Sequence, residues 1–446
     1  MDSRTHNLRI DGPRLWSTIH ETAAFGGTPA GGINRLTLSP EDGRVRDWFR
    51  AACEEAGLEV GFDVLGTQFA LRAGRDPTRA PVAFGSHLDT QPTGGRFDGV
   101  LGVLAGLEVM RTLRDAGLET EAPLLLVNWT NEEGSRFAPA MMASAAYAGD
   151  FTVEDILSRR DAAGVSVAEA LAALGIGDGE AVGARAIGAF VELHIEQGPI
   201  LEAEGTTIGV VEGGQGIAWF DGTVTGFESH AGTTPMPRRR DALVGLAEVA
   251  LAAERIALAH GPSAVATVGE VAIGAPSRNV VPGVVRFTLD TRDPAAATLD
   301  AIEGELRTAL DEIGARRGLA FDLARIWRKE PVAFDAGVIA AVDEAAQALG
   351  LNRRRIVSGA GHDACNLAGR IPAAMIFVPC RDGVSHNESE SATQGDCGAG
   401  ADVLLHAVLA LANAPQGAGP TAAGALKPGA ASARSVGTAA ADGAGP

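Results

Sequence analysis

Residues 81–113 read PVAFGSHLDTQPTGGRFDGVLGVLAGLEVMRTL and contain three successive patterns. The apolar run 81–86 predicts a buried strand that ends at His87. A polar, glycine-rich segment follows, and in residues 99–113 the apolar side chains recur at helical spacing. A strand, a loop with ionisable side chains and a helix, in this order, are typical of an α/β protein.

A second apolar run, residues 123–130 (PLLLVNWT), is followed directly by Asn131, Glu132, Glu133 and Gly134. In open α/β sheets, ligands bind beyond the carboxyl ends of the strands. The segments that follow His87 and residue 130 both occupy such a position, so we expect them to meet at one site.

The composition limits the fold and the partners. At 446 residues, with 46% apolar and 21% charged residues, the chain has the composition of a globular protein, and about two or three domains are expected. Its 37 basic and 56 acidic residues give a net charge of −19, which argues against nucleic-acid binding. Lysine occurs only at Lys329 and Lys427, so no P-loop lysine is available.

The cysteines and the N-terminal segment bear on the cellular compartment. Four cysteines show no CxxC pairing, which argues against a disulfide scaffold or a zinc knuckle. The first residues, MDSRTHNLRIDG, have no apolar signal-peptide region, and no uninterrupted apolar stretch approaches ~18 residues. We therefore expect a cytoplasmic protein that does not associate with a membrane.

A second domain is expected in the middle of the chain. After the glycine-rich residues 213–216, the patterns predict a strand at 218–225, a helix at 241–259, strands at 264–273 and 284–292, and a helix at 298–317. The predicted organisation is a catalytic domain in two parts, 1–213 and 328–413, with an inserted domain at 214–327. Residues 414–446 are rich in Ala, Gly and Pro and are predicted to be a disordered tail.

The first candidate site motif combines His87, Asp89 and Asp98. A histidine that binds a metal needs its second ring nitrogen held, and a carboxylate two residues away can do this. Asp98 lies in a glycine-flanked turn, where both of its oxygens could reach metal ions. The alternative is that His87 is a hydrogen-bonded core histidine and that Asp98 caps the following helix.

The adjacent glutamates Glu132 and Glu133 form the second motif. Neighbouring residues at a strand end point to different sides, so one can bind a metal while the other accepts a proton from the attacking water. A solvated loop pair is the alternative. The strongly apolar strand that precedes them favours a buried site.

Two further motifs each add a histidine. In residues 192–199 (ELHIEQGP), His194 lies between two glutamates, and His386 follows the apolar run 373–379. Together with His87, Asp98 and Glu133 they predict a site for two metal ions with nitrogen and oxygen ligands.

Six segments resemble, in order, the motifs of the hydantoinase/carbamoylase amidases: GSHLDTQPTGGRFDGVLGVLAGLE (85–108), NEEGSRF (131–137), ELHIEQGP (192–199), ESHAGTTPM (228–236), SGAGHDA (358–364) and GVSHNE (383–388). This group is a branch of the dinuclear metallopeptidase-like amidohydrolases. It includes N-carbamoyl-L-amino-acid hydrolases, β-ureidopropionases and allantoate amidohydrolases. The resemblance runs from about residue 26 to residue 413.

The resemblance implies a dinuclear-metal exopeptidase-like catalytic α/β domain with an inserted α+β lid that also forms a homodimer. It places His87, Asp98 and His194 on one divalent metal ion, and Asp98, Glu133 and His386 on a second. Zinc or manganese is expected, with cobalt or nickel as further possibilities. Glu132 would be the general base, and Asp89 would orient His87.

The resemblance also implies residues that bind the substrate. His230, in the lid, would reach the site of a neighbouring subunit and stabilise the oxyanion. Gln197, Asn279 and Arg292 would contact the substrate, and Arg292 suits a carboxylate. The alternative for Arg292 is an ion pair with Asp290 or Asp293 on the lid. Gly361 and His362 would line the pocket.

The function that follows from the resemblance is metal-dependent hydrolysis of a small ureido acid. We expect cleavage of N-carbamoyl amino acids, of the L-α or β-alanine type, to amino acid, ammonia and carbon dioxide. Within the group, the alternative is an allantoate amidohydrolase. A metallo-dipeptidase and a non-catalytic ligand-binding protein are more distant alternatives.

Overall fold

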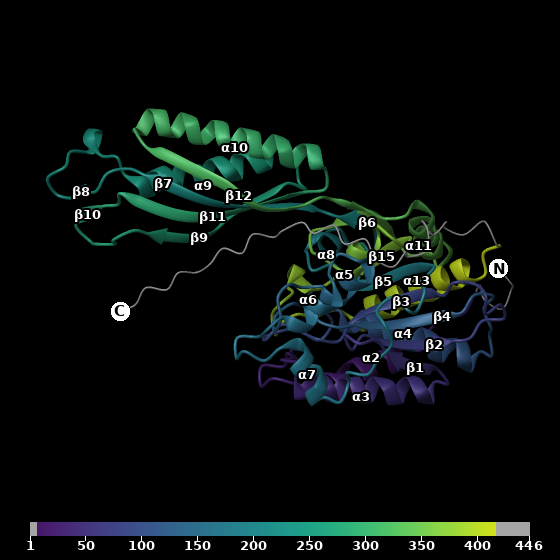
Figure 1. Ribbon diagram of the computed structural model, residues 1–446. Helices are drawn as coiled ribbons and strands as arrows, with labels where there is room; N and C mark the ends of the chain where they lie inside the picture. Colours follow the sequence, from purple (N-terminus) through teal and green to yellow (C-terminus); the bar gives the residue numbers. More distant parts are fainter. Residues whose placement is uncertain (1–6, 416–446) are drawn as a thin grey trace.

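The computed structural model describes residues 7–415 and contains two main sheets, one in each of the parts predicted as catalytic domain and lid (Figure 1). The predicted disordered tail lies outside the described residues, except for residues 414 and 415. The larger sheet has nine strands in the order β1-β2-β4-β3-β5-β15-β6-β13, with β14 paired to β6. These strands are β1 (Glu59–Phe62), β2 (Gln68–Arg72), β3 (Val82–His87), β4 (Leu124–Trp129), β5 (Ala189–Ile195), β6 (Ile208–Gly214), β13 (Val332–Ala333), β14 (Arg353–Ser358) and β15 (Ala373–Val378).

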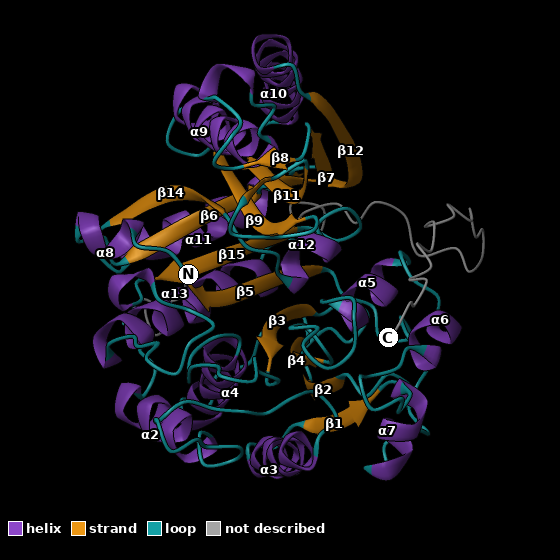
Figure 2. Ribbon diagram, turned by 90° about the vertical axis from the view of Figure 1, so that its left-hand side faces the viewer, coloured by secondary structure: helices purple, strands orange, loops and turns teal. Residues whose placement is uncertain are grey.

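Helices cover both faces of this sheet (Figure 2). The long helices α4 and α13 pack together on one face, and the short helices α5 and α12 pack together on the other. The helices of this domain are α2 (Gly12–Thr22), α3 (Pro40–Glu55), α4 (Val100–Asp115), α5 (Met142–Ala148), α6 (Val153–Ser158), α7 (Val167–Ala173), α8 (Ile200–Glu204), α11 (Ala336–Ala348), α12 (Asp363–Leu367), α13 (Gln394–Ala412) and the 3-10 turn η2 (Arg381–Gly383).

The sequence explains why these elements form. β3, β4, β5 and β15 are buried along their whole length, which is expected for the centre of a sheet covered on both faces. Ser39 and Thr393 cap α3 and α13 by accepting backbone N–H groups of the first turn. Among the described helices, α13 alone is long and apolar enough to cross a membrane, but 61% of its apolar stretch is buried inside the protein. Its apolar side chains therefore pack in the core of the protein.

The lid is built around a four-stranded antiparallel sheet of order β12-β7-β11-β9. Helices α9 and α10 pack on one face of it, and their apolar side chains form a core separate from that of the catalytic domain. The lid elements are β7 (Gly216–Thr225), β8 (Ser229–His230), η1 (Met236–Arg238), α9 (Ala242–Ala259), β9 (Val265–Ile273), β10 (Val280–Val281), β11 (Val284–Asp293), α10 (Ala296–Arg317) and β12 (Ala320–Lys329).

The predicted fold class, α/β with an inserted α+β lid, is confirmed. Each strand and helix predicted above has a counterpart within about two residues. Strand β12 was not predicted, and it continues past the predicted boundary at 327 to Lys329. The domain boundaries themselves stay predictions.

Gly85 in β3 brings the strand that carries His87 close to β4. Its φ is +146°, and a side-chain carbon there would overlap the carbonyl of Val127. Because this part of the sheet is fully buried, the neighbouring strands have little room to move.

We expect Gly85→Ala to lower the free energy of unfolding by about 1–3 kcal/mol through overpacking. The matched control is Gly304→Ala in α10, where the added carbon meets open space and a helical alanine should stabilise by about 0.5–1 kcal/mol. Denaturant titration of both variants measures the effect. Equal stability of the two variants would contradict this explanation of Gly85.

Candidate active site

Four loops converge at one edge of the larger sheet, where its central parallel strands end. β4, β3, β5 and β15 are neighbours and run parallel. His87 is the last residue of β3, His194 lies at the end of β5, and Glu132 and Glu133 follow β4. His386 lies in the loop after β15. Because the carboxyl ends of parallel strands share an edge, residues far apart in sequence meet here.

His87, Asp98 and His194 form a first group of possible metal ligands, with one ligand atom from each lying within 4.8 Å of the others. His194 Nε2 is 3.1 Å and His87 Nε2 is 3.8 Å from Asp98 Oδ1. All three side chains are buried. This is the set of residues that the resemblance implies for one ion.

Asp98, Glu133 and His386 form a second group, in which one possible ligand atom from each residue also lies within 4.8 Å of the others. His386 Nε2 lies 3.3 Å from Asp98 Oδ2 and 3.4 Å from Glu133 Oε2. The two oxygens of Asp98 therefore face different groups. A carboxylate in this position can bridge two ions.

The donors fit divalent cations. His87 Nε2 is buried and has no hydrogen-bond partner among residues 7–415, as expected for a nitrogen that binds a metal ion. Within the same residues, Asp98, Glu132 and Glu133 form ion pairs with histidines and with no lysine or arginine. Buried carboxylates without cationic partners are costly, so bound cations would stabilise them.

The two buried histidines of the first group titrate differently. Burial lowers the pKa of His87 to about 4. Burial also lowers the pKa of His194, but the hydrogen bond and charge of Asp98 outweigh it and raise the pKa to about 9. A cation bound to Asp98 would therefore compete with the proton on His194.

Backbone carbonyls hold both rings. The Nδ1 atom of His87 lies 2.9 Å from the carbonyl oxygen of Asp89, and that of His194 lies 2.9 Å from the carbonyl oxygen of Ile195. With Nδ1–H donating to these carbonyls, each Nε2 is directed into the site.

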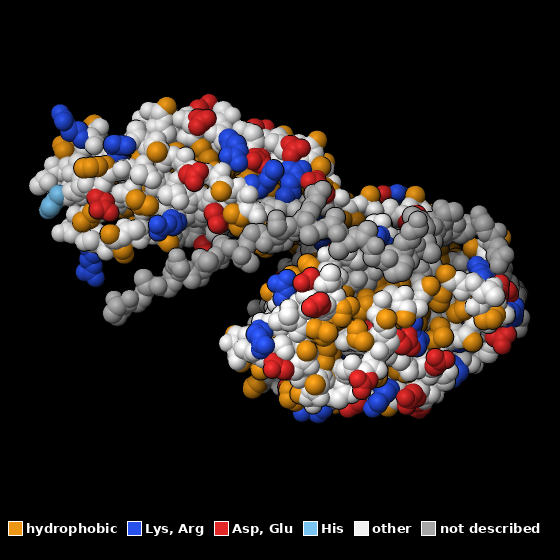
Figure 3. Space-filling model, viewed as in Figure 1, with side chains coloured by type: hydrophobic (Ala, Val, Ile, Leu, Met, Phe, Trp, Pro, Cys, Tyr) orange, Lys and Arg blue, Asp and Glu red, His pale blue; other side chains and the backbone are white. Residues whose placement is uncertain are grey.

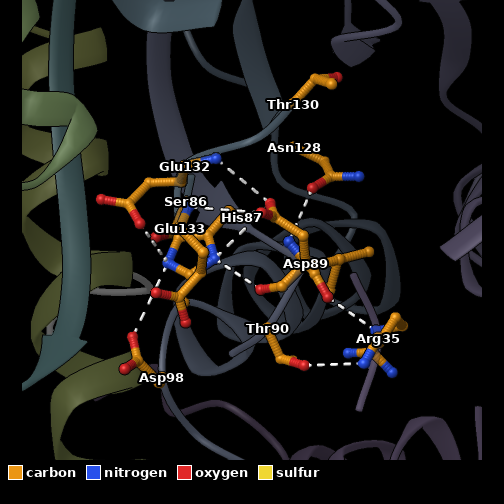
Figure 4. A network of polar contacts seen from close by, with 12 residues as sticks. Arg35, Ser86, His87, Asp89, Thr90, Asp98, Asn128, Thr130, Glu132 and Glu133 are labelled. Carbon is orange, nitrogen blue, oxygen red and sulfur yellow. Dashed lines mark hydrogen bonds and ion pairs between the residues drawn. The ribbon is translucent and has the colours of Figure 1, made fainter. Parts of the chain in front are cut away.

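The resemblance implies that Asp89 orients His87 through its carboxylate, but the structure shows a different contact. Its carboxylate is 3.9 Å from His87 Nδ1, and the closer contact is with its backbone carbonyl. The carboxylate instead accepts the backbone N–H groups of Glu132 and Glu133, at 3.3 Å each (Figure 4). Burial raises the pKa of Asp89 to about 7. Asp89 thus links the end of β3 to the turn that presents both glutamates.

Glu132 lies beside the two groups of ligands without belonging to either. Its Oε2 atom is 3.4 Å from His87 Nε2, and Figure 4 shows its carboxylate pointing toward that ring. Burial, followed by the charges of Asp363 and Glu133, raises its pKa well above the usual value. A carboxyl that readily holds a proton next to the metal ligands suits general acid–base chemistry.

Gln197 contacts Asp98 rather than open space. Its Nε2 atom donates to Asp98 Oδ2 at 2.9 Å, while its Oε1 atom is buried without a partner among the described residues. A ligand N–H group that reached this atom would supply its missing donor.

Arg292 forms hydrogen bonds both within the lid and with the catalytic domain. Its Nη2 atom is 2.8 Å from Asp290 Oδ2, and Nη1 donates to the carbonyl of Gly359 at 3.1 Å. The ion pair with Asp290 is therefore present. Both residues line a cleft of about 1370 Å³ between the lid and the catalytic domain, which also contacts Gln197.

His362 is buried and lies behind His194, with 4.6 Å between the ring centres. Its Nε2 atom contacts the Ser358 hydroxyl at 2.9 Å, and burial lowers its pKa well below the usual value. With Glu192 and His194 it forms a third group of possible metal ligands, whose ligand atoms lie within 4.8 Å of one another. Gly361, in contrast, is exposed, and it follows Gly359 at the cleft wall.

His230 and Asn279 are not brought to the metal-ligand groups of their own chain. They lie in and beside the paired strands β8 and β10, at the end of the lid farthest from the catalytic domain (Figure 1). His230 Nδ1 accepts the backbone N–H groups of Gly232 and Thr233, at 3.0 and 3.2 Å. In the neutral ring the proton is therefore on Nε2, which makes no hydrogen bond within residues 7–415.

Three residues of the site have no role in the sequence analysis. Gln91 donates to Glu133, and Ser385 and Glu390 contact Asp98. In the sequence, only their positions near Asp89 and His386 could have indicated that they belong to the site. Proximity in sequence alone does not show that a side chain turns toward the site.

Comparisons with known proteins show the family of the chain. Residues 83–410 match the sequence model of the peptidase family M20/M25/M40. The N-carbamoyl-L-amino-acid amidohydrolase of Rhizobium meliloti is 48% identical over 404 residues, which cover 90% of this chain and 97% of the relative. The allantoate amidohydrolase of Escherichia coli strain K12 is 35% identical over 405 residues, which cover 89% of this chain and 97% of the relative.

Among solved structures, a hydantoinase/carbamoylase family amidase from Burkholderia multivorans has a TM-score of 0.89 at 52% identity. The match covers 92% of this chain and 99% of that one. The chain therefore belongs to the peptidase family M20/M25/M40 and, within it, to the hydantoinase/carbamoylase amidases.

Proposed function

We propose that this protein hydrolyses the carbamoyl (ureido) group of N-carbamoyl amino acids, releasing the amino acid, ammonia and carbon dioxide. The observation that carries the proposal is the Glu132 carboxyl beside two groups of ligands that share Asp98. The 48% identity to an enzyme named for N-carbamoyl-L-amino acids supports this substrate class over allantoate, for which the named relative is 35% identical.

Two divalent ions complete the proposed site. His87, Asp98 and His194 would hold one, and Asp98, Glu133 and His386 the other. The mixed nitrogen and oxygen donors suit zinc or manganese, and also cobalt or nickel. When bound, such ions polarise a carbonyl group and lower the pKa of water.

Glu132 moves the protons of the reaction. As a carboxylate it accepts a proton from the attacking water, whose oxygen adds to the ureido carbon. As a carboxylic acid it then donates this proton to the leaving nitrogen while the C–N bond breaks. Cleavage of this bond leaves a carbamic acid, which loses carbon dioxide as its remaining C–N bond breaks and its proton passes to the nitrogen. One water is therefore consumed for each ureido group, and the products are the amino acid, ammonia and carbon dioxide.

The remaining contacts would orient the substrate. The free Oε1 atom of Gln197 can accept a ureido N–H, next to Asp98. Arg292 can bind the substrate carboxylate, in which case that group replaces part of its pairing with Asp290. Gly361 and His362 lie on the loop that meets Arg292 at Gly359.

We also propose a homodimer formed through the lid. Helix α9 exposes an apolar stripe, and β9 is an edge strand of the lid sheet. The exposed apolar side chains of this surface are Leu243, Val244, Leu251 and Leu258 on α9, and Val265 and Val271 on β9. A second copy would cover the stripe and pair the open edge.

In this assembly His230 would serve the site of the partner subunit. Its Nε2–H group, at the end of the lid, would stabilise the oxyanion there, and Asn279 beside it would contact the substrate. We place the protein in the cytoplasm, in agreement with its four free cysteines.

Ammonia release from the metal-reconstituted protein tests the substrate. We expect release from N-carbamoyl-L-α-amino acids or N-carbamoyl-β-alanine and none after chelation, because the carboxylates of the site need the ions. Release from allantoate alone would contradict the proposal and identify the protein as an allantoate amidohydrolase. No release from any of the three, with ions bound, would refute both.

Replacement of Glu132 by glutamine tests the proton transfer. We expect Glu132→Gln to lower kcat about 10²–10⁴-fold, because the amide cannot accept the proton. Its metal content should equal that of the wild-type protein, since Glu132 belongs to neither group of ligands. A near-normal kcat would remove Glu132 from the mechanism.

Co-expression of two inactive variants tests the exchange of His230 between subunits. His230→Ala alone should lose about 10²–10³-fold in rate, as for other oxyanion donors. A heterodimer of His230→Ala and Glu132→Gln, isolated through two different affinity tags, contains one complete site and should recover about half of the wild-type activity. A heterodimer as inactive as its parents would show that His230 does not cross the interface.

A further inference from the structure

Glu390 is a buried carboxylate that the mechanism does not use. It lies four residues after His386 in the same loop, and 5% of it is exposed. Its Oε1 atom accepts the backbone N–H groups of Phe97 and Asp98, at 3.0 and 3.1 Å. One side chain thus joins the loop that carries His386 to the loop that carries Asp98.

The other oxygen of Glu390 reaches the Asp98 side chain through Ser385. The Ser385 hydroxyl lies 3.1 Å from Glu390 Oε2 and 2.9 Å from Asp98 Oδ2. Gln197 Nε2 contacts the same hydroxyl at 3.1 Å. The backbone and the carboxylate of Asp98 are therefore both held from the His386 loop.

The Asp98 loop leaves room for this carboxylate at Gly95. A side-chain carbon at position 95 would overlap the Glu390 carboxylate and its Cβ atom. The loop closes around Glu390 so tightly that only a residue without a side chain fits. This steric evidence is independent of the hydrogen bonds.

The chemistry of the contacts calls for a hydrogen-bond acceptor. Two backbone N–H groups point at Glu390 Oε1, and a carboxylate offers acceptors alone. Among residues 7–415 no ion pair with lysine or arginine compensates its burial. The backbone N–H groups of Phe97 and Asp98 take that role.

We propose that Glu390 is a positioning residue that fixes Asp98 between the two ion sites and so sets the affinity for both ions. The inference rests on the proposed dinuclear site. Glu390 acts on the ions through Asp98 and His386 and has no contact with the substrate. Residues that hold a metal ligand in place typically change metal affinity about 10–100-fold when replaced.

Metal affinity of the folded protein tests this proposal. Zinc binding to the full chain is measured by equilibrium dialysis with elemental analysis, at a temperature where circular dichroism shows each variant folded. We expect Glu390→Ala to weaken binding about 10–100-fold. Glu390→Gln keeps a carbonyl oxygen for the two N–H groups, so most of the affinity should be rescued.

Glu388→Ala is the matched control. It truncates a side chain of the same charge two residues away in the same loop, where Glu388 contacts the Thr28 hydroxyl and not Asp98. Its zinc affinity should equal that of the wild-type protein. A comparable loss in Glu388→Ala would overturn the proposal, because the effect would then be a general property of the loop.

A purely structural role of Glu390 predicts a lower melting temperature with unchanged zinc affinity, and this result would also overturn the proposal. If Glu390→Ala does not fold, Glu390→Asp replaces it, since the shorter side chain keeps the charge but cannot span the same contacts. Wild-type affinity in Glu390→Asp would contradict the inference. Absence of zinc binding by the wild-type protein would refute the dinuclear site itself, which distinguishes the two failures.

Discussion

Buried negative charge around Asp98 is the constraint on which the rest of the structure depends. Asp89, Asp98, Glu132 and Glu133 gather at one sheet edge, and their described partners are histidines, neutral side chains and backbone N–H groups. Such a cluster is costly without cations. Under the proposal two divalent ions would offset this charge, since each oxygen of Asp98 faces a different group of possible ligands.

The backbone is built to bring these groups together. Parallel strands end at the same edge, so four separate segments of the chain deliver ligands to one place. Gly99, with a φ of +66°, passes directly against the His87 ring, where any side chain would overlap it. Gly95 admits Glu390 in the same way. Glycine is therefore needed at both positions near Asp98, because the His87 and Glu390 side chains lie directly against the backbone there.

Much of this could be predicted from the sequence. β3, α4 and β4 have strong apolar patterns, and the ligand candidates lie in motifs directly after strands. Strand β12 was missed because most side chains of residues 320–329 are exposed or only half-buried, and its place is decided by pairing with β7. The role of the Asp89 carboxylate and the contacts of Glu390 depend on side-chain direction, which periodicity does not contain. For Arg292 the sequence offered Asp290 or Asp293 as the partner, and the structure shows Asp290.

The position of the lid places two of the candidate residues, His230 and Asn279, far from the metal-ligand groups of their own chain. Arg292 reaches the catalytic domain of its own chain at Gly359, whereas β8 and β10 lie at the far end of the lid. Figure 3 shows the lid extending away from the catalytic domain. Under the proposed assembly, each site would combine Arg292 from its own lid with His230 from the partner.

Anomalous diffraction from crystals grown with a divalent transition metal tests the central claim most directly. The account predicts two peaks about 3.5–4 Å apart, one on each side of the Asp98 carboxylate. The first should lie next to His87 and His194, and the second next to Glu133 and His386. A single peak, or ions bound away from Asp98, would contradict the account.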